Sequence, residues 1–443
     1  MRVAVIGSGI AGLGVAHALR HAADVTLFEA DSHFGGHAHT VDLTLGGVTH
    51  GVDTGFLVLN ARTYPNLLKL FAGLDVELAK SEMSFSVQVP EAQLEWSGSS
   101  LDSVFAQRSN ALDPRFWRML ADVVRFNRVA TAIALEPGGA ARCAGPIGDF
   151  LVEHRFSTVF RDWYFLPMIG SIWSCPTAQM LRFPVATLIR FCHNHGLLQI
   201  SNRPQWYTVK GGSRRYVERI LRSIPDARLR TPVRSVRRAS SRPGTSGSER
   251  RDGVMVATDD GSQRFDAAVL ACHSDQALAL LEAPTEAERA VLGAIRYHRN
   301  RAVLHTDIDL LPRRRRAWAA WNYERGRAAG GDSAGVCLHY LIDRLQPLPF
   351  DRPVIVSLNP LREPAADQVH GEFDYAHPVF DAAATAAQAG VPQLQGVGNV
   401  WFCGAWTQYG FHEDGLRSAL AVSEDLQRRF GCHELDAALP AAA

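Results

Sequence analysis

The chain begins with Met1-Arg-Val-Ala-Val-Ile-Gly7-Ser-Gly9-Ile-Ala-Gly12, and this stretch decides the fold. Its apolar start enters a glycine-rich turn, and residues 13–20 continue with helical spacing, so it predicts a strand, a turn and a helix. Gly7 permits the tight turn, Gly9 leaves room for a pyrophosphate beside the backbone, and Gly12 allows the helix to pack closely on the strand. The stretch therefore predicts a dinucleotide-binding site.

A second strand and an acidic residue follow in the expected order. The sequence Asp24-Val-Thr-Leu-Phe-Glu29 comes after the helix, and Glu29 stands roughly 20 residues beyond the glycines, where a carboxylate accepts the ribose hydroxyls of an adenosine. Ile10 and Ala11 begin the helix, whose free N–H groups favour phosphate. These residues are assigned to cofactor binding, and we expect an α/β fold with a Rossmann-like sheet.

Composition limits the size and the partners of the protein. A chain of 443 residues exceeds one small core, so about two structural units are expected. The formal net charge of +1 gives no field that would attract nucleic acid. Positive charge is carried almost entirely by arginine, because the only lysines are Lys69, Lys80 and Lys210.

The cysteines show neither metal-binding nor disulfide spacing, which is typical of reduced thiols in a cytoplasmic protein. They are Cys143, Cys175, Cys192, Cys272, Cys337, Cys403 and Cys432. The N-terminus starts directly with a predicted core strand, which leaves no place for a signal peptide, and no apolar run is long enough to cross a bilayer. We expect a cytoplasmic protein that at most binds the inner surface of a membrane.

A second glycine pair follows in Ala30-Asp-Ser-His-Phe-Gly35-Gly36-His37-Ala-His39-Thr40. This loop resembles the Glu-Ala and Gly-Gly-Arg segment of the amine oxidase and phytoene desaturase superfamily of flavoproteins. The resemblance implies a noncovalent FAD, with Ala30, Gly36 and His37 among its contacts. His37 occupies the place at which the superfamily usually has an arginine. The alternative is a histidine-rich surface loop.

The next segment, Val48-Thr-His-Gly51-Val-Asp53-Thr-Gly55-Phe56, resembles the superfamily's Asp-x-Gly segment, which passes beside the flavin ring. The resemblance implies that Gly55 contacts the cofactor. Asp53 has a second interpretation, as the cap of a helix that begins near Arg62 and carries apolar residues at helical spacing.

The pattern changes at about residue 74, where the βαβ order ends. Two paired strands are expected at 84–90 and 93–96, followed by aromatic-rich helices within 105–134 and 147–170. Aromatic stripes usually pack a core, but this surplus also predicts an apolar pocket in an inserted α+β substrate domain. The expected FAD-binding parts are 1–73, 204–293 and 395–434, the substrate-domain parts are 74–203 and 294–394, and a tail covers 435–443.

The middle of the chain returns to the cofactor domain. His193 and His195 stand two positions apart with no third ligand nearby, so no metal site is expected. Residues 204–217 enter a glycine pair as a strand and leave it as a helix, which resembles the superfamily's returning segment. The resemblance implies that the backbone of Val233 touches the adenine.

A polar stretch at 239–253 predicts a loose hairpin tip. The strands expected at 254–258 and 265–272 then rebuild the sheet.

Residues 296–307 resemble the strand on which amine oxidases keep a lysine near the flavin, and here this stretch has no lysine. The amine oxidase reaction is therefore disfavoured. Farther on, Pro312-Arg-Arg-Arg-Arg316-Ala-Trp318-Ala-Ala-Trp321-Asn-Tyr323 combines arginines with indoles, a composition that suits a phospholipid surface. The alternative is a solvated hairpin beside core aromatics.

The C-terminal part carries Trp401-Phe-Cys-Gly404-Ala-Trp-Thr-Gln-Tyr409-Gly-Phe-His-Glu-Asp-Gly415-Leu416. It resembles the superfamily's closing cofactor motif, a strand and a loop before a helix whose first N–H groups face the pyrimidine side of the flavin. The resemblance implies contacts from Gly404, Gly415 and Leu416. Cys403 is not placed like the covalent flavin cysteine of monoamine oxidases.

Four further blocks narrow the resemblance to a smaller family. They are Gly170-Ser-Ile-Trp173-Ser, Trp206-Tyr-Thr-Val-Lys-Gly-Gly-Ser, Trp318-Ala-Ala-Trp321-Asn-Tyr and Tyr409-Gly-Phe-His-Glu-Asp-Gly415. They resemble a bacterial FAD-binding family associated with modification of membrane fatty acids, alongside cyclopropane fatty acid synthase-like methyltransferases. The resemblance implies an oxidoreductase that desaturates, isomerises or oxidises an unsaturated acyl chain, with a lipid methyltransferase as partner.

We expect His412 and Glu413 to handle protons in that reaction and Tyr409 or Phe411 to wall the flavin ring. A His-Glu-Asp run at a helix start is also a capping arrangement, so capping is the alternative for the first two residues. Two other functions compete: a flavin amine oxidase, and a flavin-binding protein without turnover that assists a lipid methyltransferase.

Overall fold

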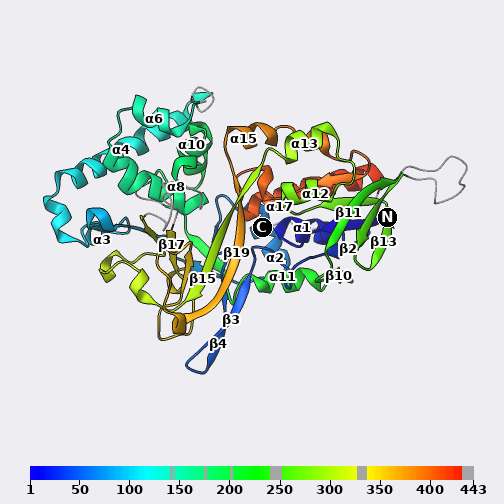
Figure 1. The fold of residues 1–443 in the computed structure, drawn as a ribbon, viewed down its shortest axis with the longest axis horizontal. Helices are drawn as coiled ribbons and strands as arrows, with labels where there is room; N and C mark the ends of the chain where they lie inside the picture. Colours follow the sequence, from blue (N-terminus) through cyan, green and yellow to red (C-terminus); the bar gives the residue numbers. More distant parts are fainter. Residues whose placement is uncertain are drawn as a thin grey trace, which may run out of the picture.

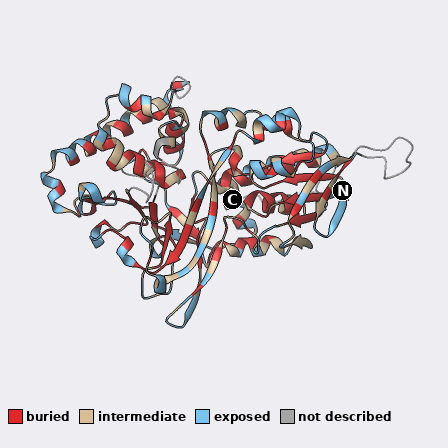
Figure 2. Cartoon of the chain, in the orientation of Figure 1, coloured by how far each residue is buried: buried red, intermediate tan, exposed pale blue. Residues whose placement is uncertain are grey.

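The structure is a computed structural model that describes residues 1–139, 143, 145–173, 177–199, 203–239, 252–326 and 337–431. Figure 1 shows two halves side by side, one holding the first strand and the last helix, the other holding most of the residues from 85 to 195. Buried residues gather in the sheets and on the inward faces of the helices, and exposed residues cover the outside (Figure 2). Among the described residues, no helix is both long and apolar enough to span a bilayer.

The first half is built on a parallel sheet with the order β10-β2-β1-β14-β20. Its strands are Arg2–Ile6 (β1), Asp24–Phe28 (β2), Asp226–Arg228 (β10), Ala267–Leu270 (β14) and Val400–Phe402 (β20). Segments far apart in sequence therefore share one sheet, with Val5 opposite Val269 and Leu270 opposite Phe402. This sheet confirms the predicted Rossmann-like fold.

Two helices from opposite ends of the chain pack against each other beside this sheet. They are α1 (Ile10–Leu19) and α17 (His412–Phe430). A Cβ added to Gly14 of α1 would lie 2.9 Å from Leu416 and 3.0 Å from Ala419 of α17. The small residues of α1 thus allow a close helix contact, which brings the C-terminal motif to the glycine turn.

The second half contains a seven-stranded sheet with the order β19-β15-β18-β17-β16-β7-β8. Its strands are Phe85–Val89 (β7), Leu94–Ser97 (β8), Arg296–His305 (β15), Trp321–Glu324 (β16), Cys337–Leu341 (β17), Ile355–Leu358 (β18) and Val369–Val379 (β19). β7 and β8 are antiparallel neighbours, which confirms the predicted strand pair.

Helices formed by residues 101–194 cover the seven-stranded sheet. They are α3 (Leu101–Val104), η2 (Arg108–Leu112), α4 (Pro114–Leu135), α6 (Ile147–Glu153), α7 (Thr158–Phe160), the π-helical turn η3 (Arg161–Phe165), α8 (Leu166–Trp173), α9 (Thr177–Met180) and α10 (Val185–Asn194). The long helix expected within 105–134 begins only at Pro114. Asp113 sets this start, because its side chain accepts the N–H of Arg115 at 2.8 Å.

The remaining strands form three smaller sheets. They are β3 (Thr40–Leu45) with β4 (Val48–Asp53), β5 (Leu59–Asn60) and β6 (Leu78–Ser81) on either side of β9 (Trp206–Val209), and β11 (Val233–Ala239) with β12 (Gly253–Thr258) and β13 (Gly261–Phe265). The strand predicted at 254–258 therefore does not rebuild the parallel sheet. It pairs antiparallel with β11 and β13, and only β14 joins the parallel sheet.

The remaining helices connect these layers. They are α2 (Pro65–Gly73), α11 (Arg214–Leu221), α12 (Ser274–Leu280), α13 (Glu286–Leu292), α14 (Ile342–Leu345), α15 (Ala382–Gln388), α16 (Val391–Leu394), η1 (Pro90–Ala92), η5 (Ile308–Leu310), η6 (Arg315–Ala317), η7 (Ala366–Gln368) and η8 (Ala405–Thr407). Most of the predicted 239–253 tip, the tail at 435–443, Cys175 and Cys432 lie outside the described residues. The domain boundaries stay predictions.

Candidate active site

A cavity of about 1170 Å³ lies between the two halves. The first half contributes the glycine turn, Glu29, the loop around His37 and the start of α17, and the second half contributes side chains of β7, β8, α8, α10 and β19. Ligand sites usually occupy about 300–1,000 Å³. The cavity is therefore large enough for a dinucleotide together with part of a second molecule.

The glycine turn has the conformation that its three glycines predict. Gly7 has a φ of +100°, which favours glycine. A Cβ at Gly12 would lie 1.8 Å from the carbonyl oxygen of Gly7, whereas a Cβ at Gly9 would meet no atom within 4 Å. Gly7, Gly9, Ile10 and Ala11 line the cavity and Gly12 does not. Gly12 therefore acts through packing, and Gly9 leaves open space beside the N-terminus of α1.

Glu29 joins the glycine turn to the second strand and also lines the cavity. One of its oxygens accepts the N–H of Ser8 at 2.9 Å and the hydroxyl of Ser8 at 2.5 Å, and the other accepts the N–H of Asp31 at 2.9 Å. A carboxylate has about four acceptor positions, so capacity for a ligand hydroxyl remains. The sequence prediction did not include Ser8, although it also lines the cavity.

The second glycine loop forms part of the cavity wall. The N–H of Gly35 donates to the carbonyl oxygen of Ser8 at 3.1 Å, which holds the loop on the glycine turn. A Cβ at Gly55 would lie 2.2 Å from the carbonyl oxygen of His37, and this oxygen accepts the N–H of Phe56 at 2.7 Å. Gly36, His37 and Gly55 line the cavity. The loop is thus not the surface loop of the alternative interpretation.

Histidines from several segments surround this loop. The ring of His37 lies 5.2 Å from that of His377 on β19 and 6.4 Å from that of His273. Burial lowers the pKa of His37, and it lowers the pKa of His39 and His377 to about 4. These imidazoles are therefore neutral at pH 7. His37 consequently does not supply the positive charge of the arginine that it replaces.

A hydrogen-bonded tyrosine stands in the same wall. The Tyr375 hydroxyl lies 2.6 Å from Thr54 Oγ1 and 2.9 Å from His39 Nδ1. Burial raises the pKa of Tyr375, so the phenol keeps its proton at neutral pH. Tyr375 comes from β19, and no motif in the sequence marks it.

His412 lines the cavity at the start of α17. Its ring stacks on Phe56 with centroids 3.7 Å apart, and its Nε2 lies 3.2 Å from the Tyr216 hydroxyl. Burial lowers the pKa of His412 to about 3. An imidazole with this pKa is a weak base at neutral pH, which argues against its predicted role as a proton acceptor.

Glu413 does not line the cavity, and its carboxylate caps α2. Oε1 accepts the N–H of Asn66 at 3.1 Å and its side-chain amide at 2.7 Å, and Oε2 accepts the N–H of Leu67 at 3.0 Å. These N–H groups lie in the first turn of α2, where no partner exists within the helix. The geometry therefore supports the alternative interpretation, in which Glu413 caps a helix, and it does not support a catalytic role for Glu413.

Asp53, unlike Glu413, does not cap α2. Its Oδ1 accepts the hydroxyls of Thr40 at 2.5 Å and Ser213 at 2.8 Å, and the N–H of Ser213 at 2.9 Å. Ser213 precedes α11, so Asp53 ties the β3–β4 hairpin to the returning segment. Burial raises the pKa of Asp53 to about 6, although these hydrogen bonds favour the ionised form.

Four other predicted contacts lie outside the cavity wall. Gly415 packs against Ile10, and Leu416 packs against α1, so both position α17 and neither lines the cavity. Ala30 is exposed, and Val233 packs in the apolar cluster behind the parallel sheet. The adenine contact of the Val233 backbone stays a prediction. Gly404, by contrast, lines the cavity as expected from its place in the motif.

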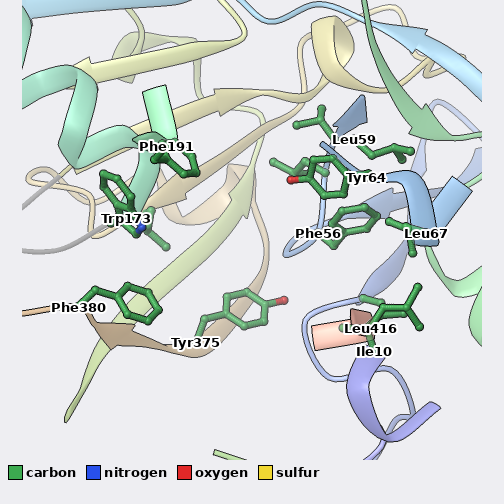
Figure 3. Close-up of a cluster of buried hydrophobic side chains, with 14 of the residues drawn as sticks. Ile10, Phe56, Leu59, Tyr64, Leu67, Trp173, Phe191, Tyr375, Phe380 and Leu416 are labelled. Carbon is green, nitrogen blue, oxygen red and sulfur yellow. The ribbon is translucent and has the colours of Figure 1, made fainter. Parts of the chain in front are cut away.

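The second half supplies an aromatic wall. Figure 3 shows Trp173, Phe191 and Phe380 across from Phe56 and Tyr64, and all five line the cavity. The Tyr409 carbonyl accepts the indole N–H of Trp173 at 3.3 Å, and Tyr409 also lines the cavity. Other apolar lining residues are Met83, Phe85, Trp96, Met168, Leu197 and Trp321. The predicted apolar pocket is thus present.

The cavity fits an adenine-flavin dinucleotide. The N-terminus of α1 is open beside Gly9, Glu29 retains acceptor capacity, and the buried Nε2 of His37 has no hydrogen-bond partner among the described residues. Cys403 is buried away from the cavity, and burial raises the pKa of the lining Cys272 to about 12. The fold and the site together define a dinucleotide-binding flavoprotein with a second, apolar compartment.

A comparison with known protein families identifies the family of this chain. Residues 10–300 match the family described as flavin containing amine oxidoreductase. The chain belongs to this family of flavin-containing oxidoreductases.

One similar protein has a carotenoid in its name. The chain is 30% identical over 308 residues to the carotenoid phi-ring synthase of Streptomyces griseus, an alignment that covers 64% of this chain and 54% of that protein. This chain thus spans about half the length of that relative.

Solved structures show the same fold at low identity. A redesigned putrescine oxidase has a TM-score of 0.65 at 14% identity, covering 97% of this chain and 100% of the other. A fatty acid isomerase from P. acnes that produces CLA has a TM-score of 0.65 at 15% identity, covering 97% and 98%. Cyclohexylamine oxidase from Brevibacterium oxydans IH-35A has a TM-score of 0.64 at 16% identity, covering 96% and 99%.

Potential metal ligands meet in the seven-stranded sheet, outside the cavity. His339 Nε2 lies 3.1 Å from Glu324 Oε2 and 3.4 Å from Cys337 Sγ, and all three residues are buried. Hydrogen-bond directions account for this group without an ion. The N–H of Asp307 donates to His305 Nδ1, so His305 Nε2 donates to Ser357. Burial opposes a charge on His339, but Cys337 and Glu324 raise its pKa to about 9, so the ring carries a proton on each nitrogen, with Nδ1 donating to Ser357 and Nε2 facing Glu324.

Proposed function

We propose that the protein oxidises, desaturates or isomerises an unsaturated hydrocarbon chain, namely the acyl chain of a membrane lipid, with FAD as cofactor. The observation that supports this proposal is the character of the second compartment, whose wall is aromatic and aliphatic. The names of two similar proteins, a carotenoid phi-ring synthase and a fatty acid isomerase, also concern unsaturated hydrocarbon substrates.

The distribution of charge in the cavity favours an uncharged substrate. The lining residues include no lysine, and the charged ones apart from Glu29 are exposed. They are Asp31, Arg203, Arg299 and Asp374. The imidazoles of His37, His39 and His377 are neutral because burial lowers their pKa values. Among the described lining residues, the second compartment offers no buried acid to an ammonium substrate, so an amine oxidase reaction is disfavoured.

FAD held in this cavity would supply a hydride acceptor, and the residues of the protein would orient the substrate and exclude water. The aromatic wall performs both tasks, because Trp173, Phe191 and Phe380 enclose the space facing Phe56. The positive end of α17 stabilises negative charge that develops nearby.

His412 contributes a hydrogen bond in this proposal and does not accept a proton. Burial raises the pKa of Tyr216, so its phenol stays protonated and can donate to His412 Nε2. His412 then holds its own proton on Nδ1 at the start of α17. The proposed proton-handling hydroxyl is Tyr375, which is held by Thr54 and His39.

Anaerobic mixing of the FAD-loaded protein with an unsaturated phospholipid tests the proposal. We expect the yellow flavin band to bleach or the double bond to move, detected by absorbance and by mass spectrometry of the recovered lipid. Bleaching by putrescine alone would support the amine oxidase alternative. No change with either compound would contradict turnover, and would favour a flavin-binding partner of a lipid methyltransferase.

Two variants separate the residue roles. His412→Gln keeps a hydrogen-bond donor, so we expect it to retain more turnover than His412→Ala at equal flavin content. Tyr375→Phe removes the hydroxyl alone and should lower turnover more than either. Unchanged turnover in both His412 variants would remove this residue from the mechanism.

A further inference from the structure

The end of the second half that is farthest from the parallel sheet carries exposed apolar side chains beside arginines. Leu101 is 80% exposed, Leu112 is 87% exposed and Trp117 is 52% exposed. They lie on α3, η2 and the first turn of α4, and Figure 1 shows α3 at the end of the molecule opposite β13. Large apolar side chains exposed to this extent in one region mark an interaction surface.

These elements form one continuous surface. The indole of Trp117 donates to the carbonyl oxygen of Ala111, which fixes it beside Leu112. Asp102 on α3 pairs with Arg108 at 2.6 Å and with Arg316 on η6 at 3.6 Å. The docking patch is therefore defined by Leu101, Arg108, Leu112, Trp117, Arg315 and Arg316.

Positive charge dominates around the patch. All four residues from Arg313 to Arg316 are exposed, and Arg115 adds a fifth exposed guanidinium near Trp117. Arg314 is paired with Glu95, whereas Arg313 and Arg315 form no ion pair within the described part of the chain. Asp102 and Asp113 offset only part of this charge. The surface therefore complements an anionic partner.

The arginine-rich segment contains the short helix η6 (Arg315–Ala317) and is not a hairpin, but its exposed arginines lie beside a half-buried indole, as the alternative interpretation expects. The indole of Trp318 donates to the carbonyl oxygen of Pro312 at 2.7 Å, and the guanidinium of Arg315 lies 5.3 Å from the Trp318 ring. Trp318 is half-buried, so the segment presents guanidinium groups outward and keeps this indole beneath them.

The docking patch adjoins the apolar compartment. Trp96 and Gly98 line the cavity, and Leu101 follows Gly98 by three residues, so their Cα atoms are at most about 11 Å apart. The docking patch therefore lies close to one wall of the compartment.

We propose that this patch docks the protein on the surface of an anionic phospholipid bilayer. The biological purpose of this docking rests on the proposed function, but the binding experiment that tests it does not. Arginines bind lipid phosphates, Trp117 suits the interface, and exposed leucines insert among acyl chains. A single-stranded nucleic acid would satisfy the arginines but would leave Leu101 and Leu112 without an apolar partner.

Vesicle co-sedimentation of the FAD-loaded, full-length protein tests the proposal. We expect binding to vesicles of phosphatidylcholine with phosphatidylglycerol, weak binding to phosphatidylcholine alone, and release by salt. Arg315→Ser with Arg316→Ser should lower the partition coefficient about tenfold or more. The matched control, Arg234→Ser with Arg428→Ser, removes the same charge from two exposed arginines outside the docking patch and should bind like the wild type.

A second pair of variants tests the apolar part. Leu101→Ser with Leu112→Ser should weaken binding at high salt, whereas Leu135→Ser with Val152→Ser, also exposed, should not. Equal binding of patch and control variants, tight binding to a single-stranded RNA without vesicle binding, or no vesicle binding at all would overturn the proposal. Vesicle binding requires no turnover, so a protein that binds vesicles but leaves their lipids unchanged would contradict only the proposed function.

Discussion

The two walls of the cavity are built in opposite ways. The nucleotide-binding wall uses glycines and backbone groups from short motifs, such as Gly7 and Gly9, and its polar side chains are tied to the backbone by several hydrogen bonds. The opposite wall uses large side chains from β7, α8, α10 and β19, which no local motif unites. The first wall recognises a ligand through fixed backbone geometry, and the second selects by apolar area and shape.

Breaking the glycine turn should have the largest effect on cofactor binding. In Gly12→Ala the new Cβ would lie 1.8 Å from the Gly7 carbonyl oxygen, so α1 must shift and the turn must open. We expect FAD affinity to fall by at least about a hundredfold, measured by flavin content and by titration of the apoprotein. Gly73→Ala is the control, because a Cβ there meets nothing within 4 Å. Full flavin content in Gly12→Ala would show that the turn tolerates the shift.

Removing the buried cap should destabilise the fold without abolishing chemistry. Glu413→Ala leaves three N–H groups of α2 without their acceptor, and we expect a loss of about 3–4 kcal/mol in the free energy of unfolding. Denaturant unfolding measures the loss, and turnover per bound flavin should be nearly unchanged. The exposed Glu424→Ala on the same helix should stay within about 0.5 kcal/mol of the wild type. A stable but inactive Glu413→Gln would instead restore a catalytic role.

A buried carboxylate behind the first wall should make stability depend on pH. The pKa of Asp53 is raised to about 6 in the folded protein, so the folded state binds its proton more tightly than the unfolded state does. This contribution is complete below about pH 4 and is lost as the pH rises through 6, by about 3 kcal/mol for this residue. Asp53→Asn should therefore show a smaller loss of stability between pH 4 and 7. Parallel pH profiles of the two proteins would refute the assignment.

Trimming the apolar wall should have the smallest effect and should spare the cofactor. Phe85→Ala removes a half-buried lining ring, and we expect about a tenfold rise in KM for an unsaturated phospholipid, equivalent to ~1.4 kcal/mol, with unchanged FAD affinity. Phe350→Ala, a half-buried ring that neither lines the cavity nor belongs to the docking patch, is the control. A loss of FAD from Phe85→Ala would show that the two walls are not independent.

Most of the first wall could be predicted because its determinants are local. A strand, a glycine turn and a helix follow one another within a dozen residues, and a Cβ at Gly12 or Gly55 would collide with backbone whatever the rest of the chain does. The pairing of β7 with β8 was likewise predictable from alternation across a short turn. The sequence could not decide between catalysis and capping for Glu413, because a helix-start acid can cap its own helix or another, and sequence spacing cannot show that α2 lies beside it.

The sequence by itself determined the parallel sheet, the dinucleotide turn and the flavoprotein class, because these depend on backbone conformations that only particular residues adopt at short range. Only the tertiary structure decided which side chains share the cavity: it brought Tyr375 to Thr54, stacked His412 on Phe56, and left His37 neutral. Burial and long-range packing set these contacts and the pKa values of His37 and His412. Neither these contacts nor these pKa values can be predicted from the spacing of residues along the chain.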